Sequence, residues 1–165
     1  MTIVVEPYHK STDVSDFCCG EPALDRYIKT QAGQDMKRRI ASCFVASDGG
    51  DVLGFYTLSS ASVALSDLPE ETVRKLPRYG EVPVVRLGRL AVDKKAQGKK
   101  IGAFLLIDAF ERVLKSEIAA FAVIVEPKND HAKAFYQHFG FDSFGSQQER
   151  LFYMLAKFQK NYVGA

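Results

Sequence analysis

The chain is poor in cysteine and has no long apolar run. Its 165 residues include three cysteines, two of them adjacent: Cys18, Cys19 and Cys43. An odd count with this spacing fits neither a disulfide framework nor a zinc site, so we expect reduced thiols and no metal. No apolar run reaches the roughly 20 residues of a membrane-spanning helix. The first residues also lack the order of a secretory signal, so we expect a cytoplasmic protein without a membrane partner.

The composition is that of an ordinary globular protein. Apolar residues make up 47% and charged residues 25% of the chain. A chain of this length can bury a substantial core. Since no repeat, low-complexity segment or linker interrupts it, we predict a single domain over residues 1–165.

Positive charge is concentrated in one stretch. The formal net charge is +2, yet residues 74–100 hold nine basic residues against Glu81 and Asp93, which gives that stretch +7. A second basic group, Lys37-Arg38-Arg39, ends the first predicted helix. Such charge indicates either a solvated face with a phosphate site for a cofactor or a surface for a polyanion.

The hydrophobic pattern predicts strands and helices in alternation. We expect strands at 2–8, 43–46, 52–60, 84–92, 121–125 and 151–155, and helices at 22–39, beside Pro69, from 101 and at 130–138. Strands interspersed with helices indicate an α/β fold with a mixed sheet. The strand–helix–strand unit from Val84 to Val125 is predicted to be a right-handed crossover.

A basic turn with glycines links the strand that ends at Val92 to the helix that begins at Ile101. Gly98 and Gly102 allow a tight bend and the close approach of a ligand to the backbone. The free N–H groups and the dipole of the helix would face this turn, which suits a pyrophosphate. The turn also carries four lysines: Lys94, Lys95, Lys99 and Lys100. Taken alone, it could equally be an ordinary strand-to-helix connection.

Two segments resemble motifs of the GNAT acetyltransferases. Residues 97–103, QGKKIGA, resemble the acetyl-CoA loop of that family, Q/R-x-x-G-x-G/A, with Lys100 at the first motif glycine. A helical residue would fit there. Residues 129–141, NDHAKAFYQHFGF, match the later motif N-x-x-A-x-x-F-Y-x-x-x-G-F at every named position. Together they identify the chain as a member of this family, which implies a twisted mixed sheet flanked by helices, with splayed central strands.

The resemblance implies a set of coenzyme-binding residues. The strand end Leu90-Ala91-Val92 would lie beside the pantetheine, and a backbone N–H near Val92 would polarise the thioester carbonyl. Amides from Gly98 to Ala103 would hold the pyrophosphate. The implied acetyl-CoA-binding residues are Leu90, Ala91, Val92, Gln97, Gly98, Lys99, Lys100, Ile101, Gly102, Ala103, Asn129 and Phe135.

Tyr136 matches the tyrosine with which the family protonates the departing coenzyme A thiolate. A phenol with a pKa of about 10 stays protonated at neutral pH, so it can act as an acid. Packing between Phe135 and Phe139 is the alternative role. No family base matches the nearby candidates Glu126, His131 and His138. An α-amine with a pKa near 8 does not need one.

The first half of the chain narrows the resemblance. Residues 17–25, FCCGEPALD, resemble the F-x-C/S-G-x-x-x-L-D opening of GNAT toxins from type II toxin–antitoxin operons, and residues 76–93 resemble their L-P-R-Y and L-G-R-L-A-V-D blocks. These toxins acetylate the α-amino group of the amino acid on a charged tRNA, which stops translation. The resemblance therefore implies acetyl-CoA as cosubstrate, an aminoacyl-tRNA substrate, a ribbon–helix–helix antitoxin partner and a homodimer.

Five arginines outside the pyrophosphate loop are predicted to contact RNA phosphates: Arg38, Arg74, Arg78, Arg86 and Arg89. Two other functions stay open on the sequence alone. One is a GNAT enzyme that acts on a small amine or a protein N-terminus. The other is a coenzyme- or nucleic-acid-binding module without turnover, suggested by Lys100 and the basic stretch. The sequence leaves open which tRNA or amino acid is chosen.

Overall fold

The computed structural model describes residues 2–145 and 149–164; residues 1, 146–148 and 165 lie outside the described part. The chain forms two compact units, Met1–Ser59 with Leu87–Ala109 and Ser60–Arg86 with Phe110–Ala165. Strands β3 (Asp51–Ala64) and β4 (Glu81–Val92) contribute residues to both units. A single domain over residues 1–165 stays a prediction.

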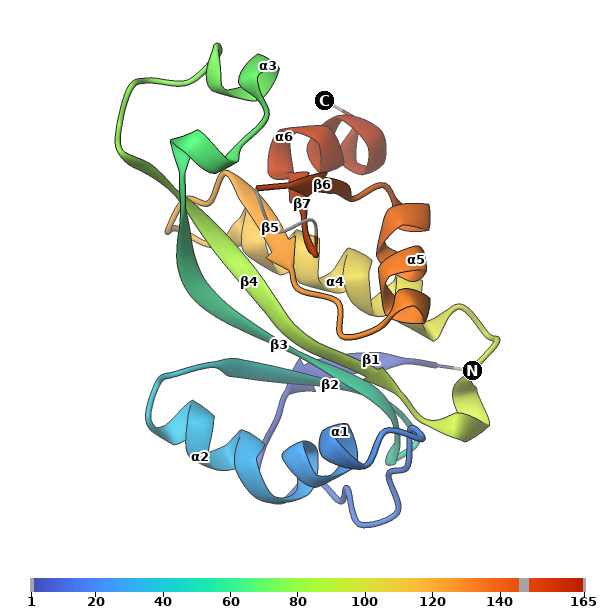
Figure 1. Cartoon of the computed structure of the whole chain (residues 1–165). Coiled ribbons are helices and arrows are strands. Elements are labelled where there is room, and N and C mark those ends of the chain that lie inside the picture. The colour runs from blue at the N-terminus through green and yellow to red at the C-terminus, as the bar shows by residue number, and fades with distance from the viewer. Residues whose placement is uncertain (1, 146–148, 165) are drawn as a thin grey trace. The chain divides into compact units, whose positions relative to one another are not determined.

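The described strands form one mixed sheet in the order β1-β2-β3-β4-β5-β7-β6 (Figure 1). The other strands are β1 (Val4–Pro7), β2 (Ser42–Asp48), β5 (Ala122–Val125), β6 (Asp142–Phe144) and β7 (Arg150–Met154). Strands β4 and β5 are parallel, whereas the pairs β1–β2, β2–β3, β5–β7 and β6–β7 are antiparallel. The predicted mixed sheet is confirmed, as is the parallel pairing that its crossover requires.

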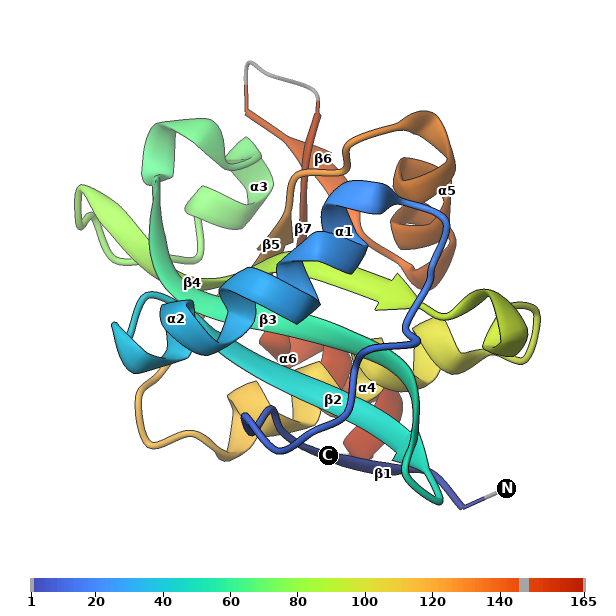
Figure 2. The ribbon, with the colours of Figure 1, turned by 90° about the horizontal axis from the view of Figure 1, so that it is seen from below.

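A continuous helical run covers one face of the sheet in the first unit. It consists of α1 (Pro22–Arg26), the π-helical segment η1 (Tyr27–Gln31) and α2 (Ala32–Lys37), as Figure 2 shows. Pro22 stands in the first turn, where its missing N–H costs nothing. The buried side chains of Tyr27 and Ile28 pack in one core with Phe55 of β3 and Ala91 of β4. The helix predicted over residues 22–39 therefore exists and ends near Lys37.

Helix α4 (Ile101–Lys115) packs on the opposite face of the same strands. Neighbouring residues of a strand point to opposite faces, so Gly54 and Tyr56 point away from Phe55. The Tyr56 hydroxyl donates to Asp108 of α4 at 2.5 Å. A Cβ on Gly54 would lie 2.6 Å from the Ala91 carbonyl oxygen, so only glycine allows this approach of β3 and β4. The predicted helix start at Ile101 is confirmed.

The second unit contains the end of α4 and the helices α3 (Glu70–Val73), α5 (Asp130–Phe139) and α6 (Leu155–Phe158). It also contains the 3₁₀ turn η2 (Leu65–Asp67) and the π-helical segment η4 (Gln159–Val163), which follows α6. One of its cores joins Ala122 and Ile124 of β5 to Val84 and Phe152. The other is aromatic. The ring of Phe110 lies 4.7–5.9 Å, between centroids, from four rings: Phe139, Phe141, Tyr153 and Phe158.

The sequence pattern missed strand β6 and the C-terminal helix. Asp142 and Ser143 of β6 are exposed, so this short strand has no apolar alternation to reveal it. The last strand, predicted over residues 151–155, ends at Met154 in the structure because Leu155 already begins α6. Phe158 and Tyr162 stack at 4.7 Å across one turn of that helical end. No helix in the described part of the chain has the length and apolar character to span a membrane.

Candidate active site

Strand β4 leads directly into the predicted coenzyme turn. In the described residues its parallel pairing with β5 covers Val84–Arg86, and its last residues, 87–92, belong to the first unit. Ala91 is buried, whereas Leu90 and Val92 are half-buried. The strand ends where the predicted pantetheine-binding residues end.

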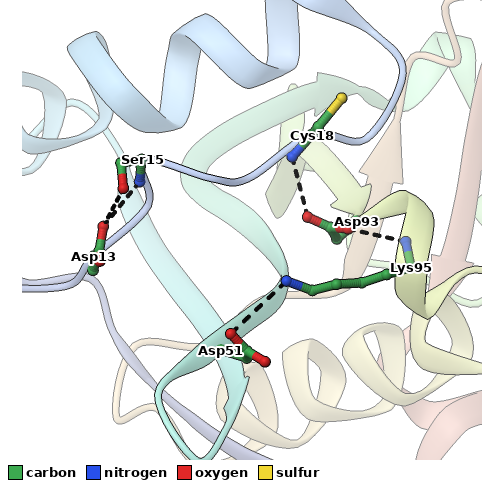
Figure 3. Close-up of polar contacts among 6 residues, drawn as sticks. All are labelled: Asp13, Ser15, Cys18, Asp51, Asp93 and Lys95. Atoms are coloured by element: carbon green, nitrogen blue, oxygen red, sulfur yellow. Dashed lines mark hydrogen bonds and ion pairs between the residues drawn. The ribbon is translucent and has the colours of Figure 1, made fainter.

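Asp93 anchors the start of the turn. Its side chain is buried, and it caps the 3₁₀ turn η3 (Lys94–Ala96) by accepting from the Lys95 N–H through Oδ1 at 2.9 Å. Its Oδ2 accepts from the Cys18 N–H at 3.1 Å (Figure 3). The Lys94 N–H in turn donates to the Cys18 carbonyl at 2.8 Å. One carboxylate thus joins the N-terminal segment to the turn.

Gln97 closes the turn with its side chain. Its Nε2 donates to the Val92 carbonyl at 2.9 Å and to the Cys19 carbonyl at 3.0 Å. The resemblance implied Gln97 as a coenzyme-binding residue, and its amide nitrogen also holds the two ends of the turn together. Asp93 was not predicted. An aspartate between a strand and a short helical turn is a typical N-cap, and this signal could have found it.

Two residues of the turn have left-handed backbone. Gly98 has φ 81° and Lys100 has φ 63°. The expectation that Lys100 would be helical is wrong, because the position keeps the conformation that a motif glycine adopts without strain. Gly102 also differs from its expected place in the turn, since it is the second residue of α4. Residues 97–100 are all exposed.

The first amides of α4 form an anion-binding end. The first backbone bond of the helix runs from the Phe104 N–H to the Lys100 carbonyl at 3.1 Å. The N–H groups of Ile101, Gly102 and Ala103 therefore have no acceptor within the described part of the chain. The helix dipole and exposed lysines add positive potential there. This chemistry fits the pyrophosphate of a coenzyme.

Tyr136 lies on α5 in the second unit, with its ring buried. The ring packs edge-on against Phe135 and Phe141, with centroids at 5.2 and 5.4 Å. The neighbour Phe139, expected to flank Tyr136, packs on Phe110 instead. Burial raises the pKa of Tyr136 above its ordinary value of 10. No group in the described residues hydrogen-bonds its hydroxyl, so the proton is available to a ligand.

The remaining motif residues of α5 have structural partners. Asn129 is the N-cap, and its Oδ1 accepts from the Ala132 N–H at 2.8 Å. Gly140 ends the helix with φ 126°, and Lys157 donates to its carbonyl at 2.8 Å. Phe135 is half-buried beside Tyr136. The motif therefore includes residues that shape the helix as well as the predicted acid.

The predicted RNA-binding arginines differ in their surroundings. Arg38, Arg74 and Arg78 are exposed, and so is Arg86, whose Nε lies 3.8 Å from Glu126 Oε1. Arg89 is half-buried, with its guanidinium 3.7 Å from the centre of the Tyr27 ring. Arg89 therefore has a packing role that its sequence position did not reveal.

Tyr27, which contacts Arg89 through its ring, also hydrogen-bonds to the buried carboxylate of Asp35. Its hydroxyl donates to Asp35 Oδ2 at 2.8 Å, and Gln31 donates to Oδ1 at 3.0 Å. The hydrogen bonds from Gln31 and Tyr27, with the nearby positive charge of Arg89, hold the pKa of Asp35 below its ordinary value.

The three cysteines are free, as expected. Burial raises the pKa of Cys19 to about 11 and that of Cys43 to about 12, so both thiols stay protonated at neutral pH. Within residues 2–145 and 149–164, no group of three or more His, Cys, Asp or Glu side chains could hold a metal ion.

The acetyltransferase motifs have counterparts in known families. The model of the Acetyltransferase (GNAT) family matches residues 10–141. The chain belongs to the GNAT acetyltransferase family. The expected family and enzyme class are therefore confirmed, and the mixed sheet is that of the GNAT fold.

A curated relative and two solved structures narrow the comparison. A tRNA-acetylating toxin from Mycobacterium tuberculosis is 42% identical over 132 residues, which cover 79% of this chain and 78% of that protein. A crystal structure of a tyrosine-to-phenylalanine mutant of KacT matches with a TM-score of 0.89 at 29% identity, over 98% of this chain and 100% of that one. AtaT complexed with acetyl-methionyl-tRNAfMet matches with a TM-score of 0.86 at 27% identity, over 96% and 98% of the two chains.

Other AtaT structures match as well. A tyrosine-to-phenylalanine mutant of AtaT bound to the C-terminus of the antitoxin AtaR has a TM-score of 0.83 at 25% identity, with 100% of this chain and 99% of that one covered. AtaTR bound with AcCoA has a TM-score of 0.81 at 28% identity, over 95% and 96%. The GNAT toxin group that the sequence resembles is thus the group that its structure resembles.

Proposed function

We propose that this GNAT enzyme is a toxin that transfers the acetyl group of acetyl-CoA to the α-amino group of the amino acid on a charged tRNA. The observation that carries the proposal is the 42% identity, over most of both chains, to a tRNA-acetylating toxin. The similarity to AtaT in complex with acetyl-methionyl-tRNAfMet supports the same substrate class. An acetylated α-amine cannot attack the peptidyl ester, so translation would stop.

The turn from Asp93 to Ala103 would bind the coenzyme. The amides of Ile101, Gly102 and Ala103 would donate to the pyrophosphate, and the turn lysines would add charge. Asp93 and Gln97 would act as positioning residues, because they hold the backbone that carries these amides. Main-chain groups near Val92 would lie beside the pantetheine.

Tyr136 would act as the general acid. The substrate amine attacks the thioester carbonyl carbon, a C–N bond forms, and the C–S bond breaks. The Tyr136 hydroxyl donates its proton to the departing sulfur, while the attacking nitrogen loses a proton to water. A buried phenol with a raised pKa and no hydrogen bond in the described residues holds its proton until a thiolate arrives.

An antitoxin and a second copy of the chain complete the proposal. AtaT binds the C-terminus of the antitoxin AtaR, which supports an antitoxin partner for this chain, and we propose a ribbon–helix–helix protein. We also propose a homodimer. Light scattering should then give twice the 18.4 kDa of the chain, and addition of the antitoxin should suppress acetylation. A monomeric mass would refute the dimer without affecting the chemistry.

The substrate is tested by comparing matched acceptors. Charged tRNA, the same tRNA without its amino acid, and the free amino acids would each be incubated with the enzyme and acetyl-CoA. We expect acetylation of the charged tRNA alone. We also expect the enzyme to inhibit cell-free translation only when acetyl-CoA is present. If free amino acids or protein N-termini are acetylated as well as the charged tRNA, the proposed toxin function is wrong, and the chain is a GNAT enzyme of another substrate class.

A further inference from the structure

Thr57 of strand β3 has a buried hydroxyl without a hydrogen-bond partner among the described residues. The polar or charged side chains buried in this part of the chain are those of Asp35, Thr57 and Asp93. Both carboxylates accept hydrogen bonds. Thr57 keeps only 1% of its surface exposed, and no described group donates to its Oγ1 or accepts from it. A buried hydroxyl without a partner is unfavourable, so its presence calls for a physical reason.

This hydroxyl can be reached by a ligand. Within residues 2–145 and 149–164, the side-chain nitrogen or oxygen that is sealed from solvent without a partner is Arg150 Nε, so Thr57 Oγ1 still touches solvent. Gly88 of β4, in the same compact unit, is exposed, and a Cβ on it would lie 3.2 Å from Oγ1. The φ of Gly88 is not left-handed, so the missing side chain, rather than backbone freedom, distinguishes this glycine. Gly88 therefore leaves the hydroxyl uncovered.

The position of Gly88 on β4 connects this hydroxyl with the proposed chemistry. The pyrophosphate would bind at the turn that follows Val92, so the pantetheine arm would run back along the strand from Val92 toward Leu90. The thioester is the end of that arm, and it lies farthest from the turn. Gly88 precedes Leu90 by two residues, which is about 7 Å along a strand. The acceptor amine must therefore approach β4 in the region of Gly88 and Thr57.

We infer that the Thr57 hydroxyl holds the amine of the acceptor during its attack on the thioester. The inference rests on the proposed function and names a further residue of that site. As the C–N bond forms, the attacking nitrogen becomes positively charged, and it then loses a proton to water. Thr57 Oγ1 accepts an N–H of this nitrogen, and a hydrogen bond from a charged donor is stronger than one from a neutral donor. Thr57 therefore stabilises the transition state more than the bound substrate.

Thr57→Val removes the hydroxyl and keeps the shape of the side chain. It should lower kcat for charged tRNA about 10- to 150-fold, as expected for a hydrogen bond to a charged group. The KM for charged tRNA and the affinity for coenzyme A should stay near the wild-type values. The variant should unfold at the wild-type temperature or above it, because a methyl group replaces an unpaired hydroxyl. Thr57→Ser should recover most of kcat; a loss of kcat that follows a loss of thermal stability, and that serine does not restore, would show a structural role and overturn the inference.

Gly88→Ala tests the same contact from the opposite strand. Its new methyl group would cover Thr57 Oγ1 without backbone strain, so kcat for charged tRNA should fall here too. The double variant with Thr57→Val should lose no more than the larger of the two single losses, because both changes act on one contact. The matched control is Gly80→Ala, at a glycine whose φ is also not left-handed and whose added Cβ would meet nothing within 4 Å. It should keep the wild-type kcat.

The outcomes separate this inference from the proposed function. A wild-type kcat in Thr57→Val, or losses that multiply in the double variant, would overturn the inference and leave the proposed function intact. If the wild-type enzyme acetylates other amines instead of charged tRNA, the proposed function is wrong. The same variants measured with those amines then decide on Thr57: a fall in kcat supports its role, and an unchanged kcat overturns it. A wild-type enzyme that acetylates no amine would overturn both.

Discussion

The coenzyme turn offers main-chain groups for its chemistry, whereas helix α5 offers a side chain. In the turn, main-chain amides of residues 101–103 are left for a ligand, while the side chains of Asp93 and Gln97 hold the backbone in place. In α5 one side chain, Tyr136, presents the reactive group, and surrounding rings hold it. A side chain that supports the turn should therefore affect coenzyme binding, and the side chain on α5 should affect turnover.

The largest effect is expected from Tyr136→Phe. Removing the hydroxyl should lower kcat by about 10²–10⁴, since general acid catalysis typically contributes this much. The ring remains, so the packing against Phe135 and Phe141 and the affinity for acetyl-CoA should stay unchanged. Steady-state kinetics with calorimetric titration of coenzyme A would show both. A variant with wild-type kcat would exclude Tyr136 from the mechanism.

Asp93→Asn should have the opposite signature. An asparagine offers one acceptor oxygen, so either the Cys18 or the Lys95 N–H loses its partner at a buried site. At about 1–3 kcal/mol for such a loss, acetyl-CoA affinity should fall roughly 5- to 150-fold, with kcat at saturation nearly unchanged.

The matched control for Asp93 is Asp51→Asn, which removes the exposed carboxylate 3.9 Å from the Lys95 ammonium (Figure 3). An exposed ion pair contributes little, so this variant should bind acetyl-CoA as the wild type does. If Asp93→Asn lowers kcat and leaves affinity unchanged, the proposed division of roles is wrong.

The pH profile tests the state of Tyr136. A raised pKa keeps the phenol protonated beyond the ordinary tyrosine value of 10, so kcat should not fall as the pH rises to 10. Any loss from deprotonation of Tyr136 should begin only above that value. Stopped-flow measurements of kcat from pH 7 to 10.5, at saturating concentrations of both substrates, would show where this loss begins. A decline centred near pH 8 that is absent from Tyr136→Phe would contradict a buried phenol.

The smallest effect is expected from Lys100→Gly. Glycine relieves the strain of left-handed backbone at φ 63°, but it also makes the unfolded chain more flexible, so stability should change by less than about 0.5 kcal/mol. Lys99→Gly is the comparison, because Lys99 has negative φ and gains nothing; it should lose up to about 1 kcal/mol. Urea denaturation would measure both. Equal losses would mean that the left-handed conformation of Lys100 carries no cost.

The same contrast explains what the sequence could predict. The start of α4 at Ile101 and the helix predicted over residues 22–39 follow from side-chain patterns, and the structure has both, the second ending at Lys37. Tyr136 follows from the resemblance to the GNAT family, and its role as the acid stays a prediction. The left-handed Lys100 was not predicted, because backbone conformation at a single position depends on the whole turn. The role of Asp93 depends on Cys18, which is 75 residues away in the chain, and local spacing contains no information on such a contact.

The packing of Arg89 could not be predicted from the sequence either. A basic residue within a basic stretch reads as a surface cation, yet its guanidinium lies on the Tyr27 ring. This contact depends on the packing of strand β4 against the helical run α1–η1–α2, which the structure shows.

The most direct test of the proposed function identifies the acetylated product itself. The enzyme would be incubated with a total pool of charged tRNA and isotopically labelled acetyl-CoA, the ester bonds then hydrolysed, and the released amino acids analysed by mass spectrometry. We predict labelled N-acetyl amino acid released from tRNA, at a rate that Tyr136→Phe lowers by about 10²–10⁴. Label confined to free amines or to protein, with the tRNA-derived amino acids unlabelled, would contradict the proposed function.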